Sequence, residues 1–175
     1  MASDFSILPN FPILIGVGAN LPHPHYGAAQ NTCELALTAL QKYNIKIAAQ
    51  SSWYKTAPVP LSDQPWYING VCLIDYRDTY DPIVLLNILH TVEEKFGRTR
   101  HVKNEPRYLD LDLLTFGCFI VEHQNVVIPH PRLHERAFVL HPLKEIMPDW
   151  FHPVSKKTID EFLQNLPPDQ QCDPI

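Results

Sequence analysis

The chain lacks the cysteine patterns that stabilise small secreted or zinc-binding domains. Its 175 residues include four cysteines, and no two of them form a CxxC pair. No histidines accompany them at zinc-finger spacing, and three of the four lie among apolar neighbours. We therefore expect free, buried thiols rather than disulfides or zinc ligands at Cys33, Cys72, Cys118 and Cys172.

The N-terminus lacks the signals that direct a chain to a membrane. It carries Asp4 where a signal peptide would have basic residues, and Gly16 and Gly18 interrupt its longest apolar run. We therefore expect neither a signal peptide nor a membrane span. The prediction is a cytoplasmic protein in a reducing compartment, without membrane association.

Positive charge is scarce overall but concentrated locally. Lys and Arg number 14 against 19 Asp and Glu, so the net charge is −5 and no basic field exists to hold nucleic acid. Apart from Arg77, the arginines all fall in one segment, as Arg98, Arg100, Arg107, Arg132 and Arg136. This distribution predicts a local anion site. The alternative for any single arginine is a solvated surface position.

Glycine-rich phosphate loops are also missing. Gly16-Val17-Gly18 begins like a dinucleotide-binding fingerprint, but Leu21 occupies the position of the third glycine. The motif GxxxxGK[ST] does not occur in the chain. A nucleotide would therefore have to be bound by side chains.

What the sequence does contain is a regular succession of strands and helices. Its length and its 45% of hydrophobic residues suit one compact domain, which we place at 13–166, between an N-terminal arm (1–12) and a disordered C-terminal tail (167–175). Hydrophobic periodicity predicts the order βαββαβ, at residues 13–17, 28–43, 45–54, 66–76, 82–96 and 107–114. This order matches an α+β, ferredoxin-like sandwich with a C-terminal strand/helix appendage. We expect helices on one face of the sheet and a site on the other, free face.

The predicted strand at 107–114 alternates leucines with carboxylates. The leucines point to one face, and Asp110 and Asp112 point to the other. Because these two charges would repel each other, a cation is expected above them. Two carboxylates suit Mg²⁺ with substrate phosphates, and guanidiniums such as Arg98 would neutralise a transferring phosphoryl group. The alternatives are the polar face of an ordinary edge strand and ion pairs among these same surface residues.

A second group of residues is aromatic. Tyr67 and Asn69 share one face of the predicted strand at 66–76, and Phe138 follows Arg136 later in the chain. A flat heterocycle could stack on a ring while the amide binds its edge. The alternative is ordinary core packing.

These motifs together resemble the 6-hydroxymethyl-7,8-dihydropterin pyrophosphokinase family of folate biosynthesis, over about residues 13–143. The matching blocks are Gly18-Ala19-Asn20-Leu21, Ser52-Trp53-Tyr54-Lys55-Thr56 with Asp63-Gln64-Pro65, Tyr67-x-Asn69, Gly97-Arg98-x-Arg100, Pro106-Arg107-x-Leu109-Asp110-Leu111-Asp112, and Pro129-His130-Pro131-Arg132-x-x-x-Arg136-x-Phe138. The resemblance implies transfer of the terminal diphosphate of ATP to the hydroxymethyl oxygen of the pterin, with two Mg²⁺ ions and release of AMP.

The resemblance also assigns roles to residues. Both metals would be held by Asp110 and Asp112, and the phosphates would be clamped by Arg98 and Arg107. The nucleotide would be bound by Glu93, Arg100, His130, Arg132 and Arg136. The pterin would contact Thr56, Pro58, Val59, Tyr67, Asn69 and Phe138. We expect a monomer whose only substrates are small molecules.

The chain departs from the family in one lid. The run Asn104-Glu105-Pro106 replaces a Trp-Gly that many members carry before the aspartate strand. Since the chain stops soon after the last matched block, we expect no fused synthase or aldolase domain. Two other functions remain open: a two-metal phosphodiesterase or nucleotidyltransferase, and a non-catalytic ferredoxin-like binding module.

Overall fold

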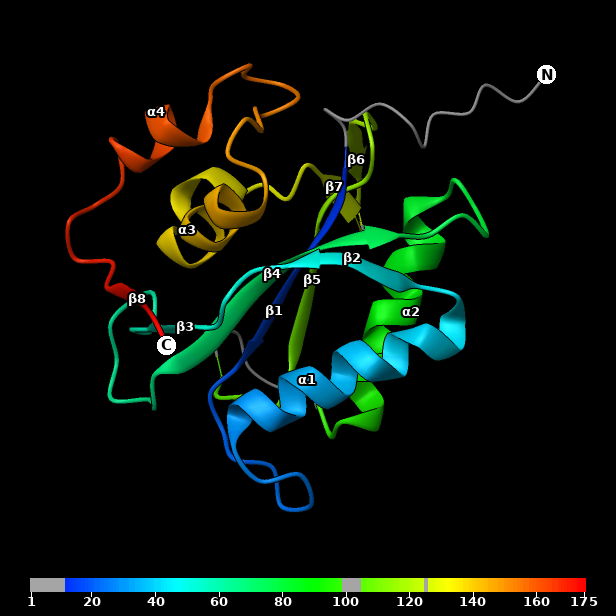
Figure 1. The fold of residues 1–175 in the computed structure, drawn as a ribbon, viewed down its shortest axis with the longest axis vertical. Helices are drawn as coiled ribbons and strands as arrows, with labels where there is room; N and C mark the ends of the chain where they lie inside the picture. The colour runs from blue at the N-terminus through cyan, green and yellow to red at the C-terminus, as the bar shows by residue number, and fades with distance from the viewer. Residues whose placement is uncertain (1–11, 99–104, 125) are drawn as a thin grey trace.

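The computed structural model describes residues 12–98, 105–124 and 126–175. Its main feature is a six-stranded sheet in the order β5-β1-β4-β3-β8, in which β2 also pairs with β4 (Figure 1). Every strand pair in it is antiparallel. The strands are β1 (Ile13–Ala19), β2 (Lys46–Gln50), β3 (Tyr54–Thr56), β4 (Tyr67–Asp75), β5 (Asp110–Thr115) and β8 (Cys172–Pro174). The mixed α+β prediction is confirmed.

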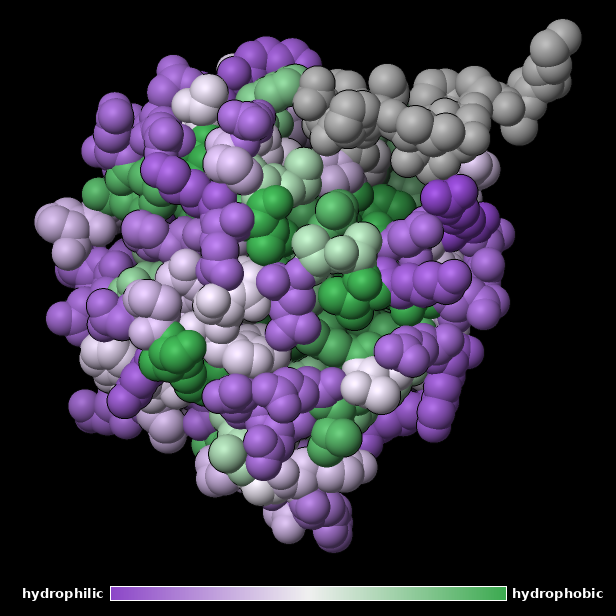
Figure 2. Space-filling model, in the orientation of Figure 1, coloured by the Kyte–Doolittle hydropathy of each residue, from purple (hydrophilic) through white to green (hydrophobic). Residues whose placement is uncertain are grey.

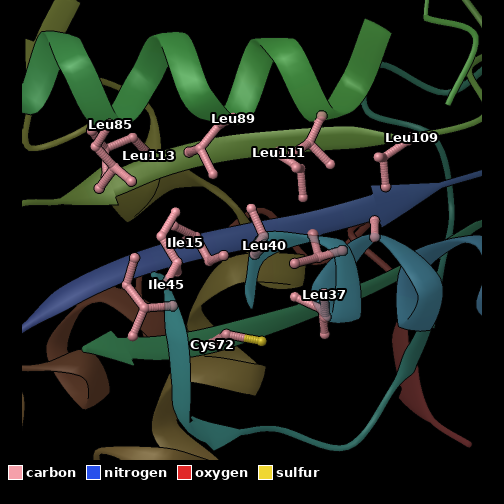
Figure 3. Close-up of a cluster of buried hydrophobic side chains, with 14 of the residues drawn as sticks. Ile15, Leu37, Leu40, Ile45, Cys72, Leu85, Leu89, Leu109, Leu111 and Leu113 are labelled. Carbon is pink, nitrogen blue, oxygen red and sulfur yellow. The ribbon is translucent and has the colours of Figure 1, made fainter. Parts of the chain in front are cut away.

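Helices α1 (Ala29–Leu40) and α2 (Pro82–Lys95) cover one face of this sheet. A short 3-10 turn, Gln41–Tyr43, follows α1. Leucines of both helices meet the apolar face of β1 and β5, and Figure 3 shows Leu89 of α2 beside Leu111 of β5. Both side chains are buried, as the alternation in β5 predicts.

The start and end of α2 follow directly from its sequence. The Asp81 side chain accepts a hydrogen bond from the Ile83 N–H at 2.8 Å, and Pro82 occupies the first turn, where a missing N–H costs nothing. Gly97 has a φ of +79°, which ends the helix without strain.

No helix in the described part of the chain is long and apolar enough to cross a bilayer. All four cysteines are free, and Cys33 and Cys72 are buried, whereas Cys118 is exposed.

The opposite face of the sheet is not free, contrary to the expectation. Helices α3 (Ala137–Ile146) and α4 (Ile159–Leu163) cover one end of it. The sheet contributes Leu14, Val71 and Leu114 to this second core. On β4 and β5 these side chains continue rows that become polar further along the strand, whereas the row on β1 continues with glycines. The same face is therefore apolar under α3 and polar on β4 and β5 beyond it. A site on this face is therefore confined to the uncovered end.

The remaining elements are small. A separate two-stranded sheet is formed by β6 (Val121–His123) and β7 (Val126–Ile128), and a 3-10 turn at Leu133–Glu135 leads into α3. On the face viewed in Figure 2, hydrophilic side chains surround a hydrophobic area over the region of β2 and α2 in Figure 1.

The C-terminal tail differs from the expectation of disorder. Cys172–Pro174 forms β8, which pairs with β3. The Ile175 N–H donates to the Trp53 carbonyl at 2.9 Å, and the Ala57 N–H donates to the Gln171 carbonyl at 3.2 Å. Without β8, the backbone groups of β3 would form an unpaired sheet edge, which is the physical reason for a tail with little hydrophobicity to become ordered. The expected arm at 1–12 lies, except for Pro12, outside the described residues.

Two glycines of β1 form a strip without side chains on the uncovered end of the sheet. Gly16 pairs with Val71 of β4 on one side and Asp112 of β5 on the other; Gly18 pairs with Asn69 and Asp110 in the same way. We call Gly16 and Gly18 the glycine strip. A Cβ at Gly18 would collide with Asn69 Oδ1, whereas a Cβ at Gly16 would make ordinary contacts of 3.7 Å.

The glycine strip yields a prediction with opposite signs at its two positions. We expect Gly18→Ala to lower the free energy of unfolding by about 1–3 kcal/mol, because Asn69 has to leave its place. Gly16→Ala should leave stability unchanged or raise it by up to about 1 kcal/mol, since it restricts the unfolded chain. Urea unfolding of both variants measures this. Equal losses at the two positions would contradict the proposed collision with Asn69.

Candidate active site

A cleft of about 340 Å³ lies over the uncovered end of the sheet. Most of the residues that the sequence singles out line it. They are Thr56, Pro58, Val59, Tyr67, Asn69, Arg107, Asp110, Asp112, Arg132, Arg136 and Phe138. The remaining candidates Arg98, Glu93 and His130 do not line it, and Arg100 lies outside the described residues.

The two aspartates of β5 are compensated by arginines from separate segments. Arg107 Nη1 donates to Asp110 Oδ2 at 2.8 Å, and Arg98 bonds to Asp110 Oδ1. Arg136 Nη1 donates to Asp112 Oδ2 at 3.2 Å. The ion pairs named above as an alternative therefore do form, but they form beside a cleft rather than on an open surface.

The electrostatic balance differs between the groups of this wall. Burial raises the pKa of Asp112 to about 6, and the negative charge of Asp110 adds to the effect, while Arg136 opposes it. Burial lowers the pKa of Arg107, but Asp110, Tyr67 and Asp112 together more than offset this effect, so that the net shift is upward. Because the pKa of Asp112 is raised, further positive charge beside this carboxylate would stabilise its ionised form.

His130 lies close to Arg132 and Arg136, two of the arginines that line the cleft. Burial, together with the nearby charges of Arg136 and Arg132, lowers its pKa to about 4. Its Nδ1 accepts the Arg132 N–H at 3.2 Å, so in the neutral ring the proton is on Nε2. At neutral pH His130 is therefore an uncharged hydrogen-bond donor.

Glu93 is buried near the end of α2, where it is 1% exposed. Its Oε1 accepts the Leu111 N–H at 2.7 Å and a bond from Arg98. Glu93 thus holds Arg98 against β5 from the side of the sheet that α2 covers, and Glu93 does not line the cleft.

The other wall of the cleft is aromatic and amidic. Asn69 Nδ2 donates to Thr56 Oγ1 at 2.7 Å, which orients the amide above Gly18. Tyr67 precedes it on the same row of β4, and its hydroxyl donates to Gln64 Oε1 at 3.3 Å. The Phe138 ring lines the cleft from α3, with the Arg136 guanidinium 5.2 Å from its centroid. A flat, polar-edged molecule therefore has both a ring to stack on and an amide to bind.

Sequence reasoning missed Asn20, which ties the loops of both walls together. Its Oδ1 accepts the Arg107 N–H at 2.8 Å, and its Nδ2 donates to the Pro65 carbonyl at 3.1 Å. Asn20 is 3% exposed. The sequence did contain a signal for Asn20: the residue directly follows β1 and belongs to the matched block Gly18-Ala19-Asn20-Leu21, to which no role was assigned. Gln64, Ala57, Pro60 and Ser62 also line the cleft without having been singled out.

Comparisons with known proteins identify the family of the chain. The family model for 7,8-dihydro-6-hydroxymethylpterin-pyrophosphokinase (HPPK) matches residues 14–148. The chain is 39% identical, over 153 residues, to the 2-amino-4-hydroxy-6-hydroxymethyldihydropteridine pyrophosphokinase of Synechocystis sp., and this match covers 87% of the chain and 75% of the relative. The enzyme of the same name from Methylorubrum extorquens is 34% identical over 154 residues, which cover 88% of the chain and 92% of the relative.

Among solved structures, HPPK-DHPS of Plasmodium falciparum has a similar fold. The TM-score is 0.69 at 15% sequence identity, over 92% of this chain and 46% of that one. At this identity the likeness concerns the fold alone. The family model and the bacterial relatives carry the assignment: the chain belongs to the 7,8-dihydro-6-hydroxymethylpterin-pyrophosphokinase family.

Proposed function

We propose that the protein transfers the terminal diphosphate of ATP to 6-hydroxymethyl-7,8-dihydropterin, in tetrahydrofolate biosynthesis. The pterin hydroxymethyl oxygen attacks the β-phosphorus, the bond from that phosphorus to the α–β bridging oxygen breaks, and the hydroxyl proton is lost as AMP leaves. The observation that carries the proposal is the cleft itself. It places arginine-paired carboxylates on one side of the glycine strip and Tyr67 with Asn69 on the other.

The arginines provide the polyphosphate side of the site. Arg107, Arg132 and Arg136 line the cleft, and Arg98 lies behind Asp110. Planar guanidiniums bind phosphate oxygens with two parallel bonds, which positions the group as well as neutralising it. We assign phosphate binding to Arg98 and Arg107, and the nucleotide to Arg132, Arg136, the uncharged His130 and Arg100. Glu93 acts through Arg98 rather than on the nucleotide.

Asp110 and Asp112 fit a magnesium site of the kind that substrate phosphates complete. In the described part of the chain no three His, Cys, Asp or Glu residues gather as a metal cage. Mg²⁺ commonly binds one or two carboxylates together with phosphate oxygens and water, so two aspartates suffice. Magnesium there would neutralise charge on the reacting phosphates. By the resemblance, two such ions are proposed.

The pterin side is assigned to the amidic and aromatic wall. Tyr67 and Phe138 would contact the faces of the bicyclic ring, and Asn69 would bind its polar edge. Thr56 holds Asn69 in place at 2.7 Å, and Pro58 and Val59 belong to the adjoining loop that lines the same wall. These contacts would hold the hydroxymethyl oxygen toward the aspartates.

We also propose that the fold is the ferredoxin-like arrangement and that the enzyme works as a cytoplasmic monomer. Support for the fold comes from the strand order β5-β1-β4, followed by a fourth strand position that two segments, β2 and β3, fill along β4. In addition, α1 and α2 lie on the same face.

The first prediction from the proposed function is the reaction. Incubation with ATP, Mg²⁺ and the hydroxymethyl-dihydropterin should give AMP and the pterin diphosphate in equal amounts, as measured by mass spectrometry. ADP as product would indicate an ordinary kinase. An absence of any product would favour a binding module and would overturn the proposal.

The second prediction separates catalysis from stability at the two aspartates. Asp112→Asn should abolish AMP formation but preserve or raise the free energy of unfolding at pH 7.5. The reason is the raised pKa: with a folded value of about 6 against an ordinary 3.8, the ionised carboxylate disfavours folding above pH 6. The stability difference from wild type should therefore shrink as the pH falls from 6 toward 4.

Asp110→Asn is the matched comparison. It should also abolish turnover, but it removes the carboxylate that pairs with Arg98 and Arg107. We expect a loss of about 1–3 kcal/mol in unfolding free energy at pH 7.5. Normal turnover in either variant would contradict the role of that aspartate.

The third prediction concerns Tyr67. Tyr67→Ala should weaken pterin binding about tenfold and change ATP binding by less than about twofold, because the lost contact is to the ring. Tyr67→Phe retains the ring and should bind the pterin nearly as wild type does. Calorimetric titration with each ligand measures both effects. Equal losses for the two ligands would count against the stacking role.

A further inference from the structure

Helix α3 begins at the cleft without a cap of its own. Its N-cap residue is Arg136, which makes no side-chain bond to the helix start. The Arg136 side chain is directed to Asp112 instead, and a guanidinium has no acceptor to offer. The first N–H groups of a helix need acceptors from elsewhere.

Gln170 supplies the missing cap from the C-terminal segment. Its Oε1 accepts the Ala137 N–H at 2.8 Å, and its Nε2 donates to the Glu135 carbonyl at 2.8 Å. One side-chain amide therefore holds the backbone immediately before and immediately after Arg136. Because one partner is a donor and the other an acceptor, the orientation of the amide is fixed.

Strand β8 holds Gln170 at this position and also contacts the opposite wall of the cleft. Cys172 pairs with Thr56, and the Gln171 carbonyl accepts the Ala57 N–H at 3.2 Å. Thr56 in turn orients Asn69. The segment 170–175 thus joins the start of α3 to the strand that carries Thr56, and Figure 1 shows β8 beside β3.

We propose that Gln170 is a positioning residue for Arg136 and Phe138, and that the pairing of β8 with β3 holds Gln170 at the site. The inference rests on the proposed function, in which these two residues contact the nucleotide and the pterin. The residues matched by the family model end at 148, well before this segment. The competing view is that β8 only covers the edge of the sheet and that Gln170 contributes stability alone.

Three variants of the full-length protein separate these views. Gln170→Ala removes both hydrogen bonds. Gln170→Glu keeps the acceptor for Ala137 and adds a negative charge that suits a helix N-terminus, but it loses the donor to the Glu135 carbonyl. Gln171→Ala is the matched control, because that side chain is exposed and its backbone carbonyl remains.

We expect Gln170→Ala to accelerate amide hydrogen exchange at Ala137 and to lower kcat/KM for both substrates about tenfold. Gln170→Glu should keep the melting temperature of the wild type and still lower kcat/KM, which a role in stability alone does not predict. Gln171→Ala should match the wild type in exchange and in kinetics.

Two results would overturn the proposal: unchanged exchange at Ala137 in Gln170→Ala, or faster exchange with unchanged kcat/KM. Failure of the proposed function is recognised separately, as a wild type that forms no pterin diphosphate. In that case the positioning role is tested by measuring the affinity of both variants for α,β-methylene-ATP with Mg²⁺. Weaker binding by Gln170→Ala than by Gln171→Ala supports the positioning role, and equal binding overturns it.

Discussion

Two like charges on one face of a strand have to be compensated, and the site is organised by the way in which this happens. Asp110 and Asp112 follow each other on β5, and their positive partners come from the end of α2, the turn before β5 and the start of α3. Each pair ties a different segment to the same strand. In the structure the arginines are therefore held by the aspartates, and under the proposed function they would become available for phosphates once the aspartates bind another cation.

This arrangement leaves Asp112 imperfectly compensated. Its raised pKa means that one guanidinium at 3.2 Å does not offset the burial and the neighbouring Asp110. A protein selected for stability alone would place a neutral side chain there. Retaining the charge costs stability, and under the proposed function the same charge would attract Mg²⁺ to the cleft, a trade between stability and function that is common at active sites.

Alternation and helix signals predicted β1, β4, β5, α1 and α2, because these depend on local periodicity. They also predicted that Asp110 and Asp112 share one face of their strand and that Tyr67 and Asn69 share one face of theirs. Features that depend on tertiary contact were not predictable. The burial of Glu93 follows from its bond to the Leu111 N–H. The ordering of 167–175 follows from an open edge at β3, and the cover over one end of the second face follows from α3 docking there. Gly16 and Gly18 can be read from the sequence, but the effect of a side chain at either position depends on which residues lie opposite in β4 and β5.

The glycine strip also limits how the cleft can change. A molecule that reaches the floor between Asn69 and Asp110 meets backbone atoms of β1, which no substitution can remove. At position 18 a larger residue collides with Asn69, so the floor cannot easily be raised to exclude an unwanted ligand. An inhibitor designed to contact this floor would therefore face few routes to resistance by single mutation.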